Sequence, residues 1–213
     1  MSELQDLASK IIIKMIRNED FFISMRDKEI LAAWSTMATM VFEFDDIDTM
    51  SILESERFWF RSLRLPPQGE WRIFVGTHVG EAWKCRLFHA GYGIAKKNDI
   101  PLVAKLNTQK TVFGIENLHF MIFSTRLLTP SMSPFNLSPS EFAAKNNLIQ
   151  LWPPTGEISK WHCVKPISDY SVTEISYEHA PNASFMSSIE IYKLKRESEG
   201  KNASNSAMKS PTY

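Results

Sequence analysis

The chain contains few cysteines and no arrangement of them that would bind a metal. Cys85 and Cys163 are its two cysteines, which are too few for a four-cysteine zinc site and do not form a Cys-x-x-Cys pair. We expect two reduced, mostly buried thiols rather than a disulfide, as is usual in cytoplasmic proteins.

An excess of one charge and a long apolar run are also missing. The 24 Lys and Arg residues balance 24 Asp and Glu residues, which argues against a broad nucleic-acid or membrane surface. No stretch approaches the roughly 18 uncharged apolar residues that cross a bilayer, and no signal-peptide pattern opens the chain. We therefore expect a cytoplasmic protein without a membrane partner.

The composition supports one domain with a tail. Hydrophobic residues make up 44% of the chain, enough to bury a sizeable core. We expect a single domain over residues 1–196. Residues 197–213 are mostly Ser, Asn, Lys, Gly and Glu, which predicts a disordered tail because such a segment buries too little to offset its ordering entropy.

Residues 1–65 have the apolar spacing of helices. One apolar face extends from Leu4 to Met15. Ser24-Met25-Arg26-Asp27 has the spacing of a capping box, and the helix that it begins should end near Asp45-Asp46. A third helical pattern covers Thr49 to Leu63.

Residues 66–196 change to the two-residue period of strands after the break at Pro66-Pro67-Gln68-Gly69. The strand candidates are Trp71–Gly76, Trp83–Phe88, Thr111–Phe113, Leu118–Phe123, Val172–Ser176 and Ile189–Leu194. The third and fourth form a hairpin around Gly114 to Asn117, and Ser138-Pro139 begins a short helix. The sequence predicts an α+β fold, with two or three N-terminal helices packed on a mostly antiparallel sheet.

Several motifs occur in an order that carries a family resemblance. They are Met1-Ser2-Glu3-Leu4-Gln5, Leu31-Ala32-Ala33-Trp34 with Met37, Val41 and Glu43, Pro66-Pro67-x-Gly69 before Trp71, Phe113-Gly114 with Leu118-x-Phe120, and Leu148-Ile149-Gln150-Leu151-Trp152-Pro153-Pro154 with Trp161. Over about residues 1–163 this order resembles the region that follows the zinc-bound nuclease motif in bacterial HNH endonuclease-type proteins.

The resemblance implies the companion region of a nuclease without its catalytic module. The metal-holding histidines and zinc-binding cysteines of HNH nucleases have no counterpart here, so no catalytic residue is carried over. Met37 and Ala38 replace a lysine and a threonine of the family pattern. We expect a non-catalytic accessory module that binds nucleic acid or a protein partner, in phage defence or a mobile element. A truncated endonuclease whose catalytic part lies upstream is an alternative.

An acidic cluster offers a different interpretation. Glu43, Asp45, Asp46 and Asp48 lie near the expected end of the second helix, and paired carboxylates can bind Mg²⁺. A solvated helix end, with Asp48 as a cap for the next segment, is the plainer reading. The alternative function is a metal-dependent nuclease or hydrolase that uses Glu43, Asp45, Asp46 and His89; only this alternative requires a cofactor, Mg²⁺.

Histidines and basic residues complete the candidates. His78, His89 and His119 could meet at a metal only if the fold brings them together, and ordinary hydrogen-bonded histidines are the commoner case, so we assign no metal site. Six basic residues accompany Trp83, Phe88 and Tyr92, a mixture that suits a nucleic-acid surface but also an ordinary half-exposed sheet. They are Lys84, Arg86, Lys96, Lys97, Lys105 and Lys110.

Overall fold

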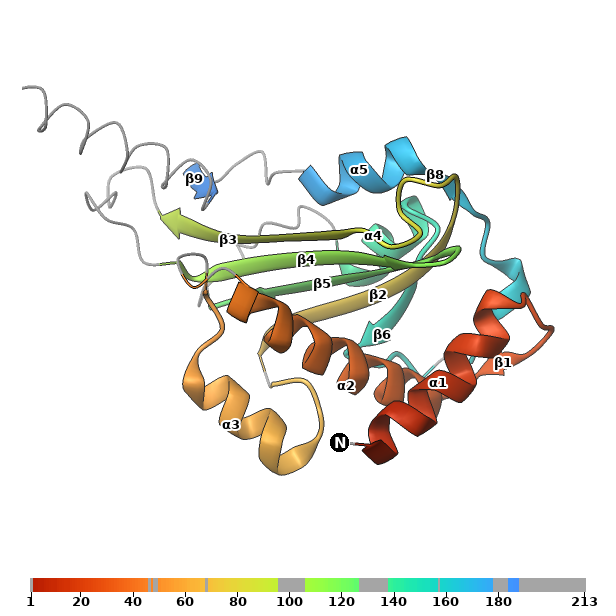
Figure 1. The fold of residues 1–213 in the computed structure, drawn as a ribbon, viewed down its shortest axis with the longest axis horizontal. Coiled ribbons are helices and arrows are strands. Elements are labelled where there is room, and N and C mark those ends of the chain that lie inside the picture. Colours follow the sequence, from red (N-terminus) through yellow and green to blue (C-terminus); the bar gives the residue numbers. More distant parts are fainter. Residues whose placement is uncertain are drawn as a thin grey trace, which may run out of the picture.

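An antiparallel sheet with helices on both faces organises the chain (Figure 1). The structure is a computed structural model. It describes residues 2–45, 47, 50–67, 69–95, 106–126, 138–156, 158–177 and 184–187. Ile189–Leu194 and the predicted tail at 197–213 lie outside these residues.

The three N-terminal helices are α1 (Ser2–Ile16), α2 (Met25–Phe42) and α3 (Glu54–Leu63). The capping box that begins α2 is present, because the Ser24 hydroxyl accepts the Asp27 N–H and the Asp27 carboxylate accepts the Ser24 N–H. A 3₁₀ turn at Glu43–Asp45 ends α2 where the sequence predicted it to end. The third helix begins at Glu54 rather than at Thr49.

The main sheet has the strand order β6-β2-β5-β4-β3-β9 within the described residues, and its neighbouring strands are antiparallel. These strands are β2 (Glu70–Val79), β3 (Leu87–Ala95), β4 (Thr108–Ile115), β5 (Leu118–Thr125), β6 (Ile149–Trp152) and β9 (Ser184–Ser187). β8 (Ile167–Ser168) pairs with the end of β2, and β1 (Phe22–Ile23) pairs with β7 (Ser159–Lys160) away from the main sheet. The α+β fold is confirmed, as is the predicted hairpin of β4 and β5.

Side chains that alternate along the strands build two cores. Ile73 of β2 and Phe120 of β5 belong to the core under α1, α2 and α3. Phe74 and Met121, their chain neighbours, belong to the core on the other face. That face is covered by α4 (Pro139–Lys145) and α5 (Asp169–Tyr177), which lie across the sheet from α2 (Figure 1).

One strand prediction was wrong, and another was wrong for most of its residues. Val172–Ser176 lies in α5, where Val172 and Ile175 are both buried on the helix face toward the sheet. The β-branched residues of this segment favour a strand, but the i, i+3 spacing of Val172 and Ile175 places both on one face only in a helix. The predicted strand Trp83–Phe88 begins only at Leu87, because residues 80–86 turn across the end of the sheet.

Neither a disulfide nor a helix that could cross a bilayer is present among the described residues. Cys85 and Cys163 are free and exposed, so the expectation of mostly buried thiols was wrong. Among the described helices, none has the length and apolar character needed to cross a bilayer.

Candidate functional site

Glu43 forms the centre of a buried polar cluster at the end of α2. Its side chain is completely buried, because the 50–53 segment, just before α3, lies over it. The carboxylate accepts hydrogen bonds from the backbone N–H of Ser51 (2.9 Å) and of Ile52 (3.1 Å), and from the Ser51 hydroxyl (3.3 Å). The segment is therefore held to the end of α2 by one side chain.

Arg57 of α3 supplies the opposite charge. Its guanidinium donates to Glu43 Oε2 at 2.5 Å and to the Met40 carbonyl at 2.7 Å, and it lies over the Phe44 ring at 4.7 Å. Burial raises the pKa of Glu43, an effect that the N–H groups of Ser51 and Ile52 and the charge of Arg57 oppose. The pair joins α2 to α3.

His89 of β3 reaches the same carboxylate from the sheet. Its Nε2 lies 3.7 Å from Glu43 Oε1, and its Nδ1 lies 2.7 Å from the Thr111 hydroxyl oxygen. The Thr111 hydroxyl donates to Gln109 Oε1 at 2.8 Å. A hydroxyl has one proton, so a Thr111 that donates to Gln109 must accept from Nδ1–H of His89. The polar chain continues from Glu43 into the centre of the sheet.

The structure brings together only part of the predicted catalytic set. Glu43 and His89 meet, whereas Asp45 is exposed and Asp46 and Asp48 lie outside the described residues. The expectation of a solvated helix end was wrong for Glu43, because the 50–53 segment covers it. No group of three or more His, Cys, Asp or Glu side chains in the described part of the chain could hold a metal ion.

The three histidines do not converge. His78 and His119 lie together on the α4–α5 face, with ring centroids 5.8 Å apart, whereas His89 contacts Glu43 on the α2 face. Among the described residues, neither ring of this pair has a hydrogen-bond partner. Burial lowers the pKa of His119 to about 3, and nearby His78 adds to the effect. Burial also lowers the pKa of His78, against the nearby Asp169 carboxylate.

The described basic residues do not share one surface. Lys84 is exposed and forms an ion pair with Glu81 at 2.8 Å, and exposed Arg86 lies over the Trp83 ring at 5.5 Å. Lys110 is only 4% exposed and donates to the Ile175 carbonyl, so it does not lie on the expected surface. Lys96, Lys97 and Lys105 lie outside the described residues.

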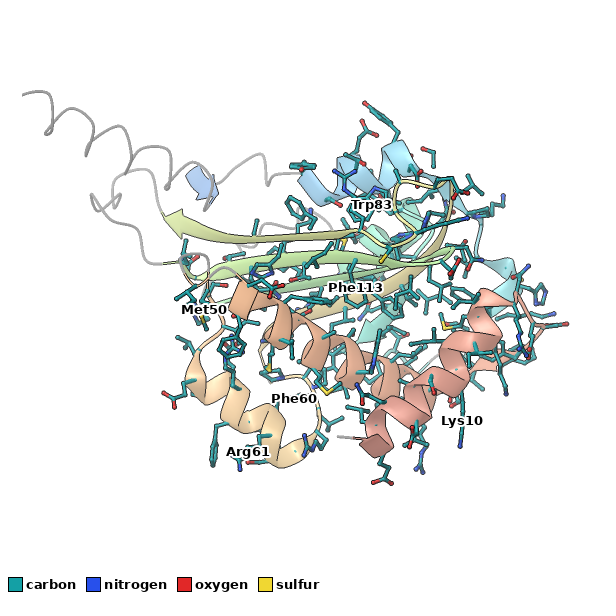
Figure 2. The ribbon with its side chains drawn as sticks, in the orientation of Figure 1. Lys10, Met50, Phe60, Arg61, Trp83 and Phe113 are labelled. Atoms are coloured by element: carbon teal, nitrogen blue, oxygen red, sulfur yellow. The ribbon has the colours of Figure 1, made fainter. Side chains whose placement is uncertain are left out.

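Trp83 likewise faces inward rather than toward a ligand. The ring is almost completely buried beside α5, and its indole N–H donates to the Thr173 hydroxyl at 3.0 Å (Figure 2). Trp83 is therefore not one of the exposed rings on which nucleic-acid bases could stack between the cations. The reason is the 80–86 turn, which carries Trp83 over the end of the sheet instead of along a strand.

Large apolar side chains are exposed around the end of α2 and along α3. This feature escaped the sequence analysis, because the same residues fit the apolar pattern of the helices. We call this region the α2–α3 apolar surface; it comprises Val41, Phe44, Ile47, Leu53, Phe58 and Leu63, each at least 47% exposed.

The chain was compared with models of known protein families, with curated proteins and with solved structures, and none of them matched. The function therefore has to be inferred from the chemistry of its own residues.

Proposed function

We propose that this protein is a non-catalytic module that binds a protein partner, comparable to the companion region of an HNH-type nuclease. The α2–α3 apolar surface carries the proposal. Monomeric proteins rarely leave many large apolar side chains in one region open to water, and such regions commonly mark interaction sites. A bacterial cytoplasm and a role in phage defence or a mobile element belong to the same proposal and rest on the order of the sequence motifs.

The surroundings of Glu43 support a structural rather than a catalytic role. A metal ligand or a general base needs an oxygen that can reach metal or substrate. Both Glu43 oxygens already accept hydrogen bonds from Ser51, Ile52 or Arg57, and the side chain is completely buried. The carboxylate is engaged in holding α2 to α3.

A protein partner is favoured over nucleic acid by the arrangement of the cations. Of the candidate cations in the part of the chain that the structure describes, Lys84 and Arg86 are exposed on the 80–86 turn, and Lys84 already forms an ion pair with Glu81. Lys110 is buried. Nucleic-acid surfaces usually present several cations along one face to the phosphates.

One observation favours a second candidate, a metal-dependent nuclease or hydrolase. Glu43 and His89, which are far apart in sequence, lie 3.7 Å apart and are both shielded from water. Paired acids and imidazoles of this kind occur in active sites. In this alternative Mg²⁺ would be the cofactor.

A cleavage and binding assay separates these functions. The purified protein is incubated with plasmid and with short single- and double-stranded DNA and RNA, in Mg²⁺, Mn²⁺ or EDTA, at low and moderate salt. We expect neither cleavage nor retardation. Metal-dependent cleavage that Glu43→Gln abolishes, in a variant that still folds, would overturn the non-catalytic proposal. Salt-sensitive retardation that a Lys84→Glu, Arg86→Glu double variant removes would replace the protein partner with nucleic acid.

A further inference from the structure

The exposed face of α3 carries a negative charge, an aromatic ring and a positive charge in that order. Glu54, Phe58 and Arg61 are spaced i, i+4 and i+7, which places them on one helix face. All three are exposed, and Phe58 is 69% exposed. Phe60, by contrast, is buried between α3 and α2, while Arg61 lies on the outer side of α3 (Figure 2).

Both charges on this face remain available to a partner. Arg57, one turn from Glu54, is occupied by Glu43 and the Met40 carbonyl. Within the described residues, neither Glu54 nor Arg61 takes part in an ion pair. A binding partner for this face should therefore offer a positive group opposite Glu54, an apolar group opposite Phe58 and a negative group opposite Arg61.

We propose that this partner is a second copy of the same chain, bound through α3 about a two-fold axis that passes near Phe58; the inference rests on the proposed function. In an antiparallel pair of α3 helices, each Phe58 packs on the other. At a rise of 1.5 Å per residue, Glu54 lies about 6 Å to one side of Phe58 and Arg61 about 4.5 Å to the other. The two-fold axis therefore sets Glu54 of each copy close to Arg61 of the other.

Neighbouring features extend the same interface. The Phe44 ring lies over Arg57 of α3 and is 61% exposed, so it adds apolar area beside the helix. The formal net charge of the chain is zero, so two copies approach without net repulsion. A two-fold interface uses the same surface patch of both copies, so that patch must be complementary to itself. The order of charges along α3 meets this requirement.

The first test measures association of the full chain by analytical ultracentrifugation over a range of protein concentrations. We expect a reversible dimer, and we expect Phe58→Ser to raise the dissociation constant by about a hundredfold, equivalent to about 2.7 kcal/mol. Tyr170→Ser is the matched control, because Tyr170 of α5 is also 69% exposed but lies on the opposite side of the sheet. It should leave the dimer unchanged.

Charge exchange tests the orientation of the helices. Glu54→Arg alone and Arg61→Glu alone each set like charges together and should be monomeric. An equimolar mixture of the two variants restores both opposite-charge pairs and should form a heterodimer. Far-ultraviolet circular dichroism and thermal unfolding establish that each variant is folded.

The possible results have distinct meanings. A wild-type chain that stays monomeric at every concentration would overturn the self-association. A dimer that is unaffected by Phe58→Ser and by both charge variants would overturn the proposed α3 interface. Neither result affects the proposed non-catalytic role, which fails only in the cleavage and binding assay.

Discussion

Replacing Glu43 should destabilise the protein strongly although it removes no large apolar group. Glu43→Ala leaves the N–H groups of Ser51 and Ile52 and the guanidinium of Arg57 without their acceptor in a buried site. Each buried donor left unsatisfied costs about 1–3 kcal/mol, and breaking a buried ion pair typically costs about 3–5 kcal/mol. Because solvent can reach part of Arg57, we expect the free energy of unfolding to fall by about 3–4 kcal/mol.

Thermal and urea unfolding measure this change. For a chain of this length, a loss of about 3–4 kcal/mol lowers Tm by roughly 10 °C. Asp45→Ala is the control, since Asp45 is exposed in the same 3₁₀ turn and should change stability by no more than about 0.5 kcal/mol. A Glu43→Ala variant whose free energy of unfolding stays within about 1 kcal/mol of the wild type would refute the anchoring role.

A double-mutant cycle identifies the interaction responsible. Arg57→Ala also breaks the pair with Glu43, so the loss in Glu43→Ala/Arg57→Ala should be smaller than the sum of the single losses. Additive losses would mean that Arg57 stabilises α3 independently of Glu43, through the Met40 carbonyl and the Phe44 ring.

Two further predictions concern the sheet. Burial lowers the pKa of His119 to about 3 from an ordinary 6.5, so the unfolded chain binds more protons than the folded one between these values. The contribution of neutral His119 to the free energy of unfolding is complete above about pH 6.5. It is lost as the pH falls toward 3, at up to about 1.4 kcal/mol per pH unit. His119→Leu should flatten this part of the stability–pH curve in urea unfolding, and an unchanged slope would contradict the prediction. Gly114→Ala should destabilise the protein by at least about 2 kcal/mol in thermal unfolding, because the added Cβ would overlap the Trp83 carbonyl oxygen. Gly156→Ala, with no atom within 4 Å of its added Cβ, is the control, and equal losses in the two variants would show that the close packing is not responsible.

Some elements follow from sequence alone because neighbouring residues specify them. The capping box of Ser24 and Asp27 begins α2 as predicted. The change to a two-residue period after Pro66-Pro67 predicts β2, and the alternation on either side of the 116–117 turn predicts the β4–β5 hairpin. These signals act within a few residues along the chain, so they are legible without the fold.

Other features depend on partners that are distant in sequence. Val172, Thr173 and Ile175 are β-branched and favour a strand locally, but packing of Val172 and Ile175 on the back of the sheet decides for the helix. Lys110 looks like a surface cation until α5 covers it and the Ile175 carbonyl accepts from it. Asp45 and Glu43 look equivalent until the segment at Ser51 and Ile52 closes over only one of them.

The sequence by itself therefore determined the fold class and the positions of the N-terminal helices, β2 and the β4–β5 hairpin, because helix caps, turns and apolar periodicity are local properties. Only the tertiary structure decided which polar groups are buried and which apolar groups remain exposed. Burial of Glu43 depends on the segment at Ser51 and Ile52 together with Arg57 and His89, and the exposure of Phe58 depends on how α3 packs on α2. These are distances between segments far apart in the chain, and periodicity along one segment contains no information about them.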